Sequence, residues 1–319
     1  MDTQSNSFAA QGERGLHSKR EAGSGAAYIP RALEPLVLSL SQEYPVLLLT
    51  GPRQTGKTTM LKRLMEGTQR SYISLDSFET RRDAQEDPAR FLQRYQPPLL
   101  IDEVQYAPQL LTYIKIVVDE RGRPGDYWLT GSQVFKLMRG VQESLAGRVA
   151  HLKMSPLSQS EIARSQNVPF TVDRERLLAM QDTRRARTSD EVFETMYRGS
   201  MPALVGDKHN STAIFYSSYL DSYIERDVRD LSPGLDSFRF LDFIKSAAIR
   251  CGQVVNFASM ARDAGISEKT AKGWLGLLET LGIVVLLYPS SNTALSRTLK
   301  SPKLYFFDTG LAAHLAGFD

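Results

Sequence analysis

The stretch that decides the fold is residues 46–59, VLLLTGPRQTGKTT. Its first five residues are apolar and β-prone, and the run has the length of a buried parallel strand. The segment that follows places Met60, Leu61 and Leu64 on one face of a helix. Between strand and helix, residues 51–58 match G-x-x-x-x-G-K-[ST], the P-loop or Walker A pattern. The motif therefore occurs in the strand–loop–helix context that it requires.

The residue types in this loop suit phosphate binding. Gly51 and Gly56 let phosphate oxygens approach main-chain N–H groups without a side chain in the way. The helix N-terminus adds a partial positive charge, Lys57 adds a full charge, and the Thr58 hydroxyl is placed to bind magnesium. The alternative is a glycine turn that happens to contain a lysine. We expect these residues to bind ATP: Gly51, Pro52, Arg53, Gln54, Thr55, Gly56, Lys57, Thr58 and Thr59.

A second short strand ends in two acids. Residues 97–103 read PPLLIDE, so the apolar run closes on Asp102 and Glu103. In a parallel sheet, this run would end at the same edge as the P-loop strand. We expect Asp102 to hold Mg²⁺, directly or through water, and Glu103 to orient and deprotonate the attacking water. Acids that merely end a strand are the alternative interpretation.

A third strand, at residues 127–130, is followed by Gly131, Ser132 and Gln133. A polar residue at this point of a neighbouring strand reaches the γ-phosphate or the water that attacks it. Thr130 and Ser132 are the candidates for this sensor, and Ser132 is our choice as a catalytic residue. Turn residues that only cap the strand would look the same in the sequence.

Composition narrows the class of protein. The 319 residues are 42% hydrophobic and 24% charged, which is ordinary for a globular protein of this length. The net charge of +3 permits contact with nucleic acid without requiring it. The single cysteine, Cys251, excludes an intrachain disulfide and a cysteine-rich zinc site. The sequence shows neither a membrane span nor a signal peptide, and we expect a cytoplasmic protein.

The pattern changes beyond residue 238. Residues 239–252, 254–265 and 266–282 are typical of three helices, and residues 283–288 of a strand, which together indicate a winged helix-turn-helix. The third helix offers only Lys269, Thr270 and Lys272 near its start to a DNA groove. The winged-helix segment is therefore at least as well explained as a packing or lid module as it is as a DNA-binding module. We expect a disordered tail at 1–27, a core at 28–158, a helical lid or linker at 159–237, a winged-helix-like domain at 238–290, and the start of an incomplete C-terminal domain at 291–319.

Several blocks together resemble one protein family. PVLLLTGPRQTGKTTML, LLIDEVQYAPQLLTYIKIVVDE, WLTGSQ, ESLAGRV and SPLSQSEI look like successive blocks of a prokaryotic AAA+ ATPase family. Its members join this core to a C-terminal domain of unknown function. YRGSMPAL, YLDSYIERDVRDL, TAKGWLGLLETLGIVVLL and SPKLYFFDTGLAAHL resemble the later part of that family. The resemblance covers roughly residues 28–315.

The resemblance implies a fold and roles for residues. It implies an α/β fold, a P-loop NTPase of the AAA+ type with a parallel sheet core, in which a strand separates the P-loop strand from the acidic strand. It implies that residues 51–58 bind ATP, that Asp102 and Glu103 serve magnesium and hydrolysis, and that Ser132 or a neighbour is the sensor. Arg148, in AGRV, sits where such ATPases present an arginine to a neighbouring subunit. A cation that balances a helix C-terminus is the equal alternative for Arg148.

Family members usually continue into a part that resembles a restriction nuclease, so we expect any nuclease activity of that part to be missing here. Three functions compete. The first is an ATP hydrolase in which nucleotide state moves the helical and winged-helix modules. The second is a slow ATP/ADP switch that contacts DNA or protein. The third, a P-loop kinase, is weaker because a water-activating Glu103 beside Asp102 suits hydrolysis better. Assembly into a homo-oligomer is left open.

Overall fold

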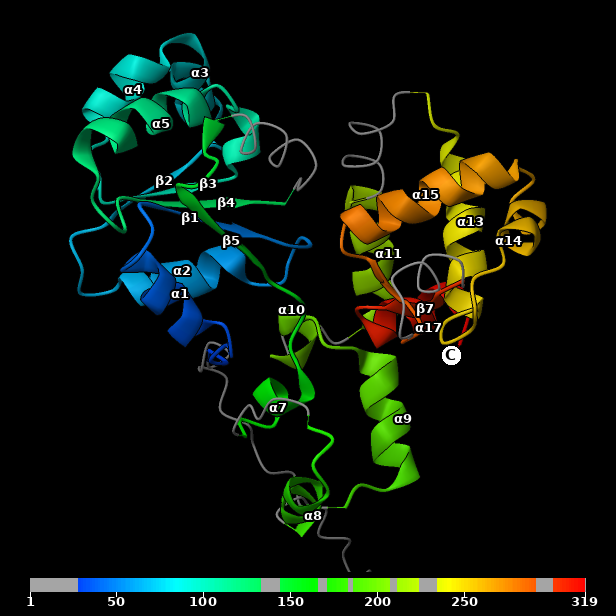
Figure 1. The fold of residues 1–319 in the computed structure, drawn as a ribbon. Helices are drawn as coiled ribbons and strands as arrows, with labels where there is room; N and C mark the ends of the chain where they lie inside the picture. The colour runs from blue at the N-terminus through cyan, green and yellow to red at the C-terminus, as the bar shows by residue number, and fades with distance from the viewer. Residues whose placement is uncertain are drawn as a thin grey trace, which may run out of the picture.

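The computed structural model describes residues 28–132, 144–165, 171–182, 186–206, 211–223, 234–290 and 301–318. The predicted tail at residues 1–27 lies outside these ranges. Figure 1 shows an α/β body formed by the first part of the chain and a mostly helical body formed by the C-terminal part. Helices α7, α8 and α10 lie along the path between the two bodies, and α9 leads from there into the second.

The α/β body is built as the P-loop pattern predicts, with helices between the strands. In chain order it contains α1 (Glu34–Ser41), β1 (Val46–Thr50), α2 (Lys57–Met65), β2 (Ser71–Ser74), α3 (Phe78–Glu86), α4 (Pro88–Arg94), β3 (Leu99–Asp102), η1 (Val104–Tyr106), α5 (Leu110–Arg121), β4 (Tyr127–Gly131) and β5 (Val149–Lys153).

The strands form one parallel sheet in the order β2-β3-β4-β1-β5. Strand β4 lies between the P-loop strand β1 and the acidic strand β3, which confirms the intervening strand that the resemblance implies. In the register, Thr50 lies beside Gly131, and Ile101 lies beside Leu129. The carboxyl ends of β1, β3 and β4 therefore meet at one edge, where the P-loop opens.

Helices cover both faces of the sheet because the strands are apolar on both sides. Side chains alternate along β1, so that Val46 and Leu48 pack on one face with α3, α4 and α5. Leu47 and Leu49 pack on the other face with α1 and α2. Figure 1 shows the same three layers, with α3, α4 and α5 above the sheet and α1 and α2 below it. The two layers therefore fix the positions of the strands that end at the P-loop edge.

The rest of the described chain is mostly helical. It contains α7 (Gln159–Ile162), α8 (Arg174–Asp182), α9 (Ser189–Arg198), α10 (Pro202–Val205), α11 (Thr212–Tyr223), α13 (Ser237–Ile249), α14 (Phe257–Asp263), α15 (Glu268–Thr280), β6 (Val284–Leu287), β7 (Lys303–Phe306) and α17 (Thr309–Ala316). None of the helices described in either body combines the length and the apolarity that crossing a membrane would need.

One hydrophobic core joins segments that the sequence analysis assigned to three domains. Phe240 and Phe243 of α13 pack with Tyr216 of α11 and with Leu304 and Leu311 from the end of the chain. Strand β7 pairs antiparallel with β6, so residues 303–306 complete the sheet that begins at residue 284. The predicted domain boundaries after residues 237 and 290 therefore fall inside one packed unit. The physical reason is that the apolar residues of α11, α13 and α17 are buried in one shared core.

Asp308 ties this second body together. Its carboxylate is buried and accepts hydrogen bonds from the Ser200 amide at 2.7 Å, the Ser200 hydroxyl at 3.0 Å and the Tyr216 hydroxyl at 2.6 Å. It also caps α17 by accepting from the Leu311 amide at 2.7 Å. Burial and the neighbouring carboxylate raise the pKa of Tyr216 well above its usual value, so the phenol remains a donor. The acid that ends β7 therefore has a structural role here.

Replacing Asp308 with alanine should lower the free energy of unfolding of the second body by roughly 2–4 kcal/mol, because four buried donors lose their acceptor. The matched control is Asp236→Ala, which removes the exposed N-cap of α13 and should cost about 1 kcal/mol. Urea unfolding would be followed by Trp274 fluorescence in a Trp128→Phe background. Equal losses in the two variants would contradict this role for Asp308.

Candidate functional site

The P-loop bends through backbone conformations that explain its glycines. Gly51 has φ of 144° and Gly56 has φ of 92°, both in the region that favours glycine. A Cβ on Gly51 would also overlap the main-chain oxygen of Met154, which follows β5. The Thr55 hydroxyl closes the turn by donating to the Pro52 carbonyl at 2.9 Å. The loop then enters α2 at Lys57, so the helix N-terminus faces the loop.

Lys57 lies inside this turn. Its ammonium donates to the Gly51 carbonyl at 2.9 Å and to the Pro52 carbonyl at 2.8 Å, and the residue is buried. Phosphate oxygens at the loop would compete with these two carbonyls for the same charge. The ammonium therefore already lies inside the P-loop, where the motif predicts that it meets the outer phosphates.

Asp102 is held by donors from three elements. The Thr58 hydroxyl donates to Asp102 Oδ1 at 2.8 Å, and the Thr130 hydroxyl of β4 donates to the same oxygen. The Tyr72 hydroxyl of β2 donates to Oδ2 at 3.2 Å. Burial, together with the Asp102 charge, raises the pKa of Tyr72 to about 12, so this phenol is a donor at neutral pH. The arrangement joins the P-loop helix to the acidic strand.

Glu103 meets Ser132 at the end of the neighbouring strand. The amide and the hydroxyl of Ser132 both lie 3.3 Å from Glu103 Oε2. The side-chain amide of Gln105 donates to the same carboxylate oxygen and lies 3.4 Å from the Ser132 hydroxyl. Glu103 itself has φ of 56°, a strained value for a residue with a side chain. The structure therefore brings Glu103 and Ser132 together, as the strand order requires, and adds Gln105 to them.

The other predicted loop residues are placed differently. Pro52 is buried beside Lys57, and Arg53 is half-buried. Gln54 and Thr59 are exposed, and neither contributes to the polar contacts of Asp102 or Glu103 described above.

Arg148 lies away from this edge of its own chain. Its carbonyl accepts from the Val46 amide, so the residue sits at the amino end of β1 and β5, opposite the P-loop. Its guanidinium is paired with Asp119 on α5. The hydrogen bonds from Arg148 and Lys115 hold the pKa of Asp119 below its usual range. A contribution of Arg148 to catalysis would therefore require a neighbouring subunit.

Two residues near the loop were missed from the sequence. Arg31 precedes α1 and donates to the Thr55 carbonyl at 2.7 Å, although no motif marks it. Gly282 follows α15, and a Cβ there would lie 3.0 Å from Pro52 Cγ. These contacts join segments far apart in the sequence. Gln105, which binds Glu103, was also missed. It alone had a local signal, because it lies two residues after Glu103 in the quoted acidic block.

Replacing Thr130 with valine should reveal how much the Asp102 arrangement depends on its buried donors. The change keeps the shape of the side chain but removes the donor to Asp102 and the acceptor for the Glu103 amide. We expect the free energy of unfolding to fall by about 1–3 kcal/mol. The control is Thr112→Val on the exposed face of α5, which should stay within about 0.5 kcal/mol of the parent.

The measurement is urea unfolding followed by Trp128 fluorescence in a Trp274→Phe background. Trp128 lies in the sheet beside Thr130, so its signal follows the α/β body. A Thr130→Val variant as stable as the Thr112→Val control would show that this hydroxyl does not support the acidic strand.

Comparisons with known proteins agree with this geometry. Residues 43–163 match the family described as an AAA domain, and residues 189–319 match a domain of unknown function (DUF8612). The chain is similar to uncharacterized proteins of Mycobacterium tuberculosis and Mycobacterium bovis, each 30% identical over 277 residues. The match covers 86% of this chain but only 57% of those proteins, so the chain spans little more than half of their length.

A solved structure has the same fold. The Walker-type ATPase of Pyrococcus abyssi superposes with a TM-score of 0.56 at 17% sequence identity, covering 90% of this chain and 96% of that one. This likeness concerns the fold and extends over both bodies. The P-loop geometry, the strand order and the two matched families lead to one conclusion: the chain belongs to the AAA+ P-loop ATPases that carry a C-terminal domain of unknown function.

Proposed function

We propose that this protein binds ATP with magnesium in the loop at residues 51–59 and hydrolyses it. The observation that carries the proposal is the convergence of Thr58 and Asp102 beside the paired Glu103 and Ser132. Hydrolysis needs a metal-binding oxygen pair and a base for water next to a phosphate-binding loop. All of these groups lie at the carboxyl edge of β1, β3 and β4.

The chemistry of Thr58 and Asp102 fits a magnesium ion. Both offer hard oxygen atoms, and these lie 2.8 Å apart, as two neighbouring ligands of one small ion can. Across the described ranges, no cluster of three or more His, Cys, Asp or Glu side chains is placed to hold a metal. A magnesium ion here would thus need phosphate oxygens and water as its other ligands, which is its habit at nucleotide sites. When bound, it would neutralise charge on the phosphates.

Within this proposal, each side chain has one task. Lys57 would exchange its bonds to the loop carbonyls for the outer phosphates. Glu103 would accept a proton from the attacking water, and Ser132 would orient Glu103 and the γ-phosphate. Gln105 would hold the Glu103 carboxylate from the other side. The backbone of Glu103 leaves β3 in a left-handed conformation, and its carboxylate lies beside Ser132.

Arg148 is kept as a candidate arginine finger acting on a neighbouring subunit. Its position at the opposite edge of its own sheet suits a residue that serves another copy of the chain, since a residue there cannot reach the P-loop of its own chain. The proposal therefore includes a homo-oligomer. Sizing the protein with and without ATP addresses this part separately.

We further propose that nucleotide state gates the second body, in which 238–290 forms a winged-helix unit together with β7. The order of α13, α14, α15, β6 and β7 supports the winged helix, as does the bridge between Val254 and Lys303. Two contacts with the P-loop support the gating. Gly282, after α15, lies against Pro52, and Pro202 of α10 lies near Gly56. Movement of the loop would reach the second body through both.

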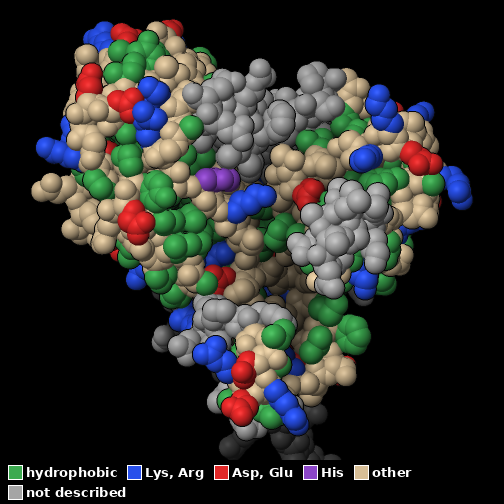
Figure 2. Space-filling view, viewed as in Figure 1, with side chains coloured by type: hydrophobic (Ala, Val, Ile, Leu, Met, Phe, Trp, Pro, Cys, Tyr) green, Lys and Arg blue, Asp and Glu red, His purple; other side chains and the backbone are tan. Residues whose placement is uncertain are grey.

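The alternative function is a slow ATP/ADP switch whose output is contact with DNA or protein. Lys269 and Lys272 at the start of α15 are exposed, which favours it. On the face in Figure 2, however, Lys and Arg side chains are interspersed with Asp and Glu over both bodies. Such a mixed surface gives nucleic acid little attraction. Salt-sensitive DNA binding that depends on the nucleotide would favour this alternative.

The Glu103→Gln variant should release phosphate from ATP about 10²–10⁴-fold more slowly than the parent, because the amide cannot accept the proton. Its affinity for ATP should stay within a few fold of the parent. The control is Glu120→Gln on the exposed end of α5, which should retain the parent rate. Steady-state phosphate release and equilibrium binding of a fluorescent ATP analogue provide the two measurements. Equal rates for Glu103→Gln and the parent would remove Glu103 from this role.

The Gly282→Ala variant should uncouple the second body from the nucleotide. ATP should change amide hydrogen exchange in the turn between α15 and β6 of the parent, and this change should be reduced in the variant, because the added methyl group meets Pro52. Gly265→Ala is the matched control, since Gly265 has φ of 63° against 71° for Gly282 but has nothing within 4 Å of its position for a Cβ. Identical behaviour of the two variants would argue against gating through this contact.

A further inference from the structure

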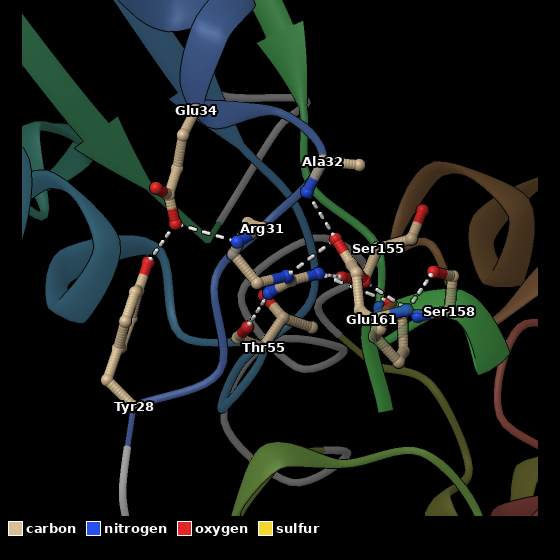
Figure 3. A network of polar contacts seen from close by, with 9 residues as sticks. Tyr28, Arg31, Ala32, Glu34, Thr55, Ser155, Ser158 and Glu161 are labelled. Carbon is tan, nitrogen blue, oxygen red and sulfur yellow. Dashed lines mark hydrogen bonds and ion pairs between the residues drawn. The ribbon is translucent and has the colours of Figure 1, made fainter. Parts of the chain in front are cut away.

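Arg31 lies on the segment that precedes α1, and its guanidinium is buried beneath the P-loop. One terminal nitrogen donates to the Thr55 carbonyl at 2.7 Å. The other donates to the Ser155 carbonyl at 2.7 Å and lies 3.3 Å from the Pro156 carbonyl. Figure 3 shows the side chain pointing from its own segment toward the other two. A single guanidinium thus joins the P-loop, the segment after β5 and the segment before α1.

Glu161 holds the charge of Arg31 in place. Arg31 Nε donates to Glu161 Oε1 at 3.1 Å, and both side chains are almost fully buried. The same carboxylate accepts from the Ala32 amide and the Ser158 amide, each at 2.7 Å (Figure 3). Burial alone would raise the pKa of Glu161, but these two amides and the Arg31 charge lower it overall. Glu161 is therefore ionised at neutral pH and forms a buried ion pair whose hydrogen bonds are satisfied.

The consequence for the P-loop follows from the geometry of a peptide. In a planar trans peptide the C=O and the next N–H point in opposite directions. Because Arg31 holds the Thr55 carbonyl toward itself, the amide of Gly56 in the same peptide points to the other side. If the loop binds phosphate as we propose, that side is the one that faces it, because P-loops meet phosphate with main-chain amides. Gly56 has the left-handed conformation that this turn needs.

We propose that Arg31 is a positioning residue that fixes the peptide between Thr55 and Gly56 so that its amide faces the phosphates of a bound nucleotide. The inference rests on the proposed function, because it assumes that the loop binds ATP. Arg31 acts through the loop and does not touch the nucleotide. Lysine cannot replace it, since one ammonium on a flexible chain does not reproduce the planar fork that reaches Thr55, Ser155 and Glu161 at once.

The test compares Arg31→Lys with Glu161→Gln in the full chain. The lysine variant keeps the buried charge but loses the fork, and its Kd for a fluorescent ATP analogue with Mg²⁺ should rise at least about tenfold, as loss of one charge-assisted hydrogen bond does. In steady-state kinetics its KM should rise with little change in kcat. Glu161→Gln keeps the guanidinium and its bond to Thr55. It should lower the midpoint of thermal unfolding while changing Kd less than threefold.

A purely structural role would give another pattern, because both variants would then lose thermal stability without a selective loss of affinity. If Arg31→Lys does not fold, Arg31→Gln combined with Glu161→Gln removes both charges together and should show the same rise in Kd. A Kd within twofold of the parent in either substitution of Arg31 would overturn the inference. Lys57→Ala serves as the control variant, which should not bind the ATP analogue. A parent protein that binds no better than Lys57→Ala would overturn the proposed function and this inference together.

Discussion

The hydrogen bond between Thr58 and Asp102 is the contact on which the site depends. It links the first turn of α2 to the end of β3, across the position of β4, and Thr130 of β4 donates to the same carboxylate oxygen. The start of α2 and the carboxyl ends of β3 and β4 are thus fixed relative to one another. The strands can present these groups at their carboxyl ends because apolar layers cover both faces of the sheet. Rigid strands and a short loop then suffice to preorganise a polar site.

The second body is organised by a different constraint, a buried carboxylate. Asp308 collects donors from the end of α9, from α11 and from α17, so that segments over a hundred residues apart share one acceptor. Gly282 of this body lies close to Pro52 of the P-loop, and Pro202 of α10 lies close to Gly56. The site and the second body are therefore neighbours in space, which is the physical basis for the gating that we propose. The Asp308 cluster keeps that body a single unit through which such a movement would pass.

Much of the site could be predicted because its signals are local. The strand, the P-loop and the helix follow one another within residues 46–65, and the acids and Ser132 each end a short apolar strand. The strand order then brings them together without further information. The Arg31–Glu161 pair could not be found in this way, because the two residues are 130 positions apart and nothing in the sequence links them. The boundary expected at residue 290 falls inside one packed unit for a similar reason. Strands β6 and β7 pair across it, and no local pattern predicts that pairing.

The most direct test of the account is a crystal structure with a non-hydrolysable ATP analogue and Mg²⁺. We expect the β- and γ-phosphates to lie against the amides of residues 51–58, with Lys57 turned from the loop carbonyls toward them and with Thr58 and Asp102 beside the metal. The bond from Arg31 to the Thr55 carbonyl should persist. A nucleotide bound elsewhere, or an Asp102 and Glu103 that face away from the phosphates, would contradict the account.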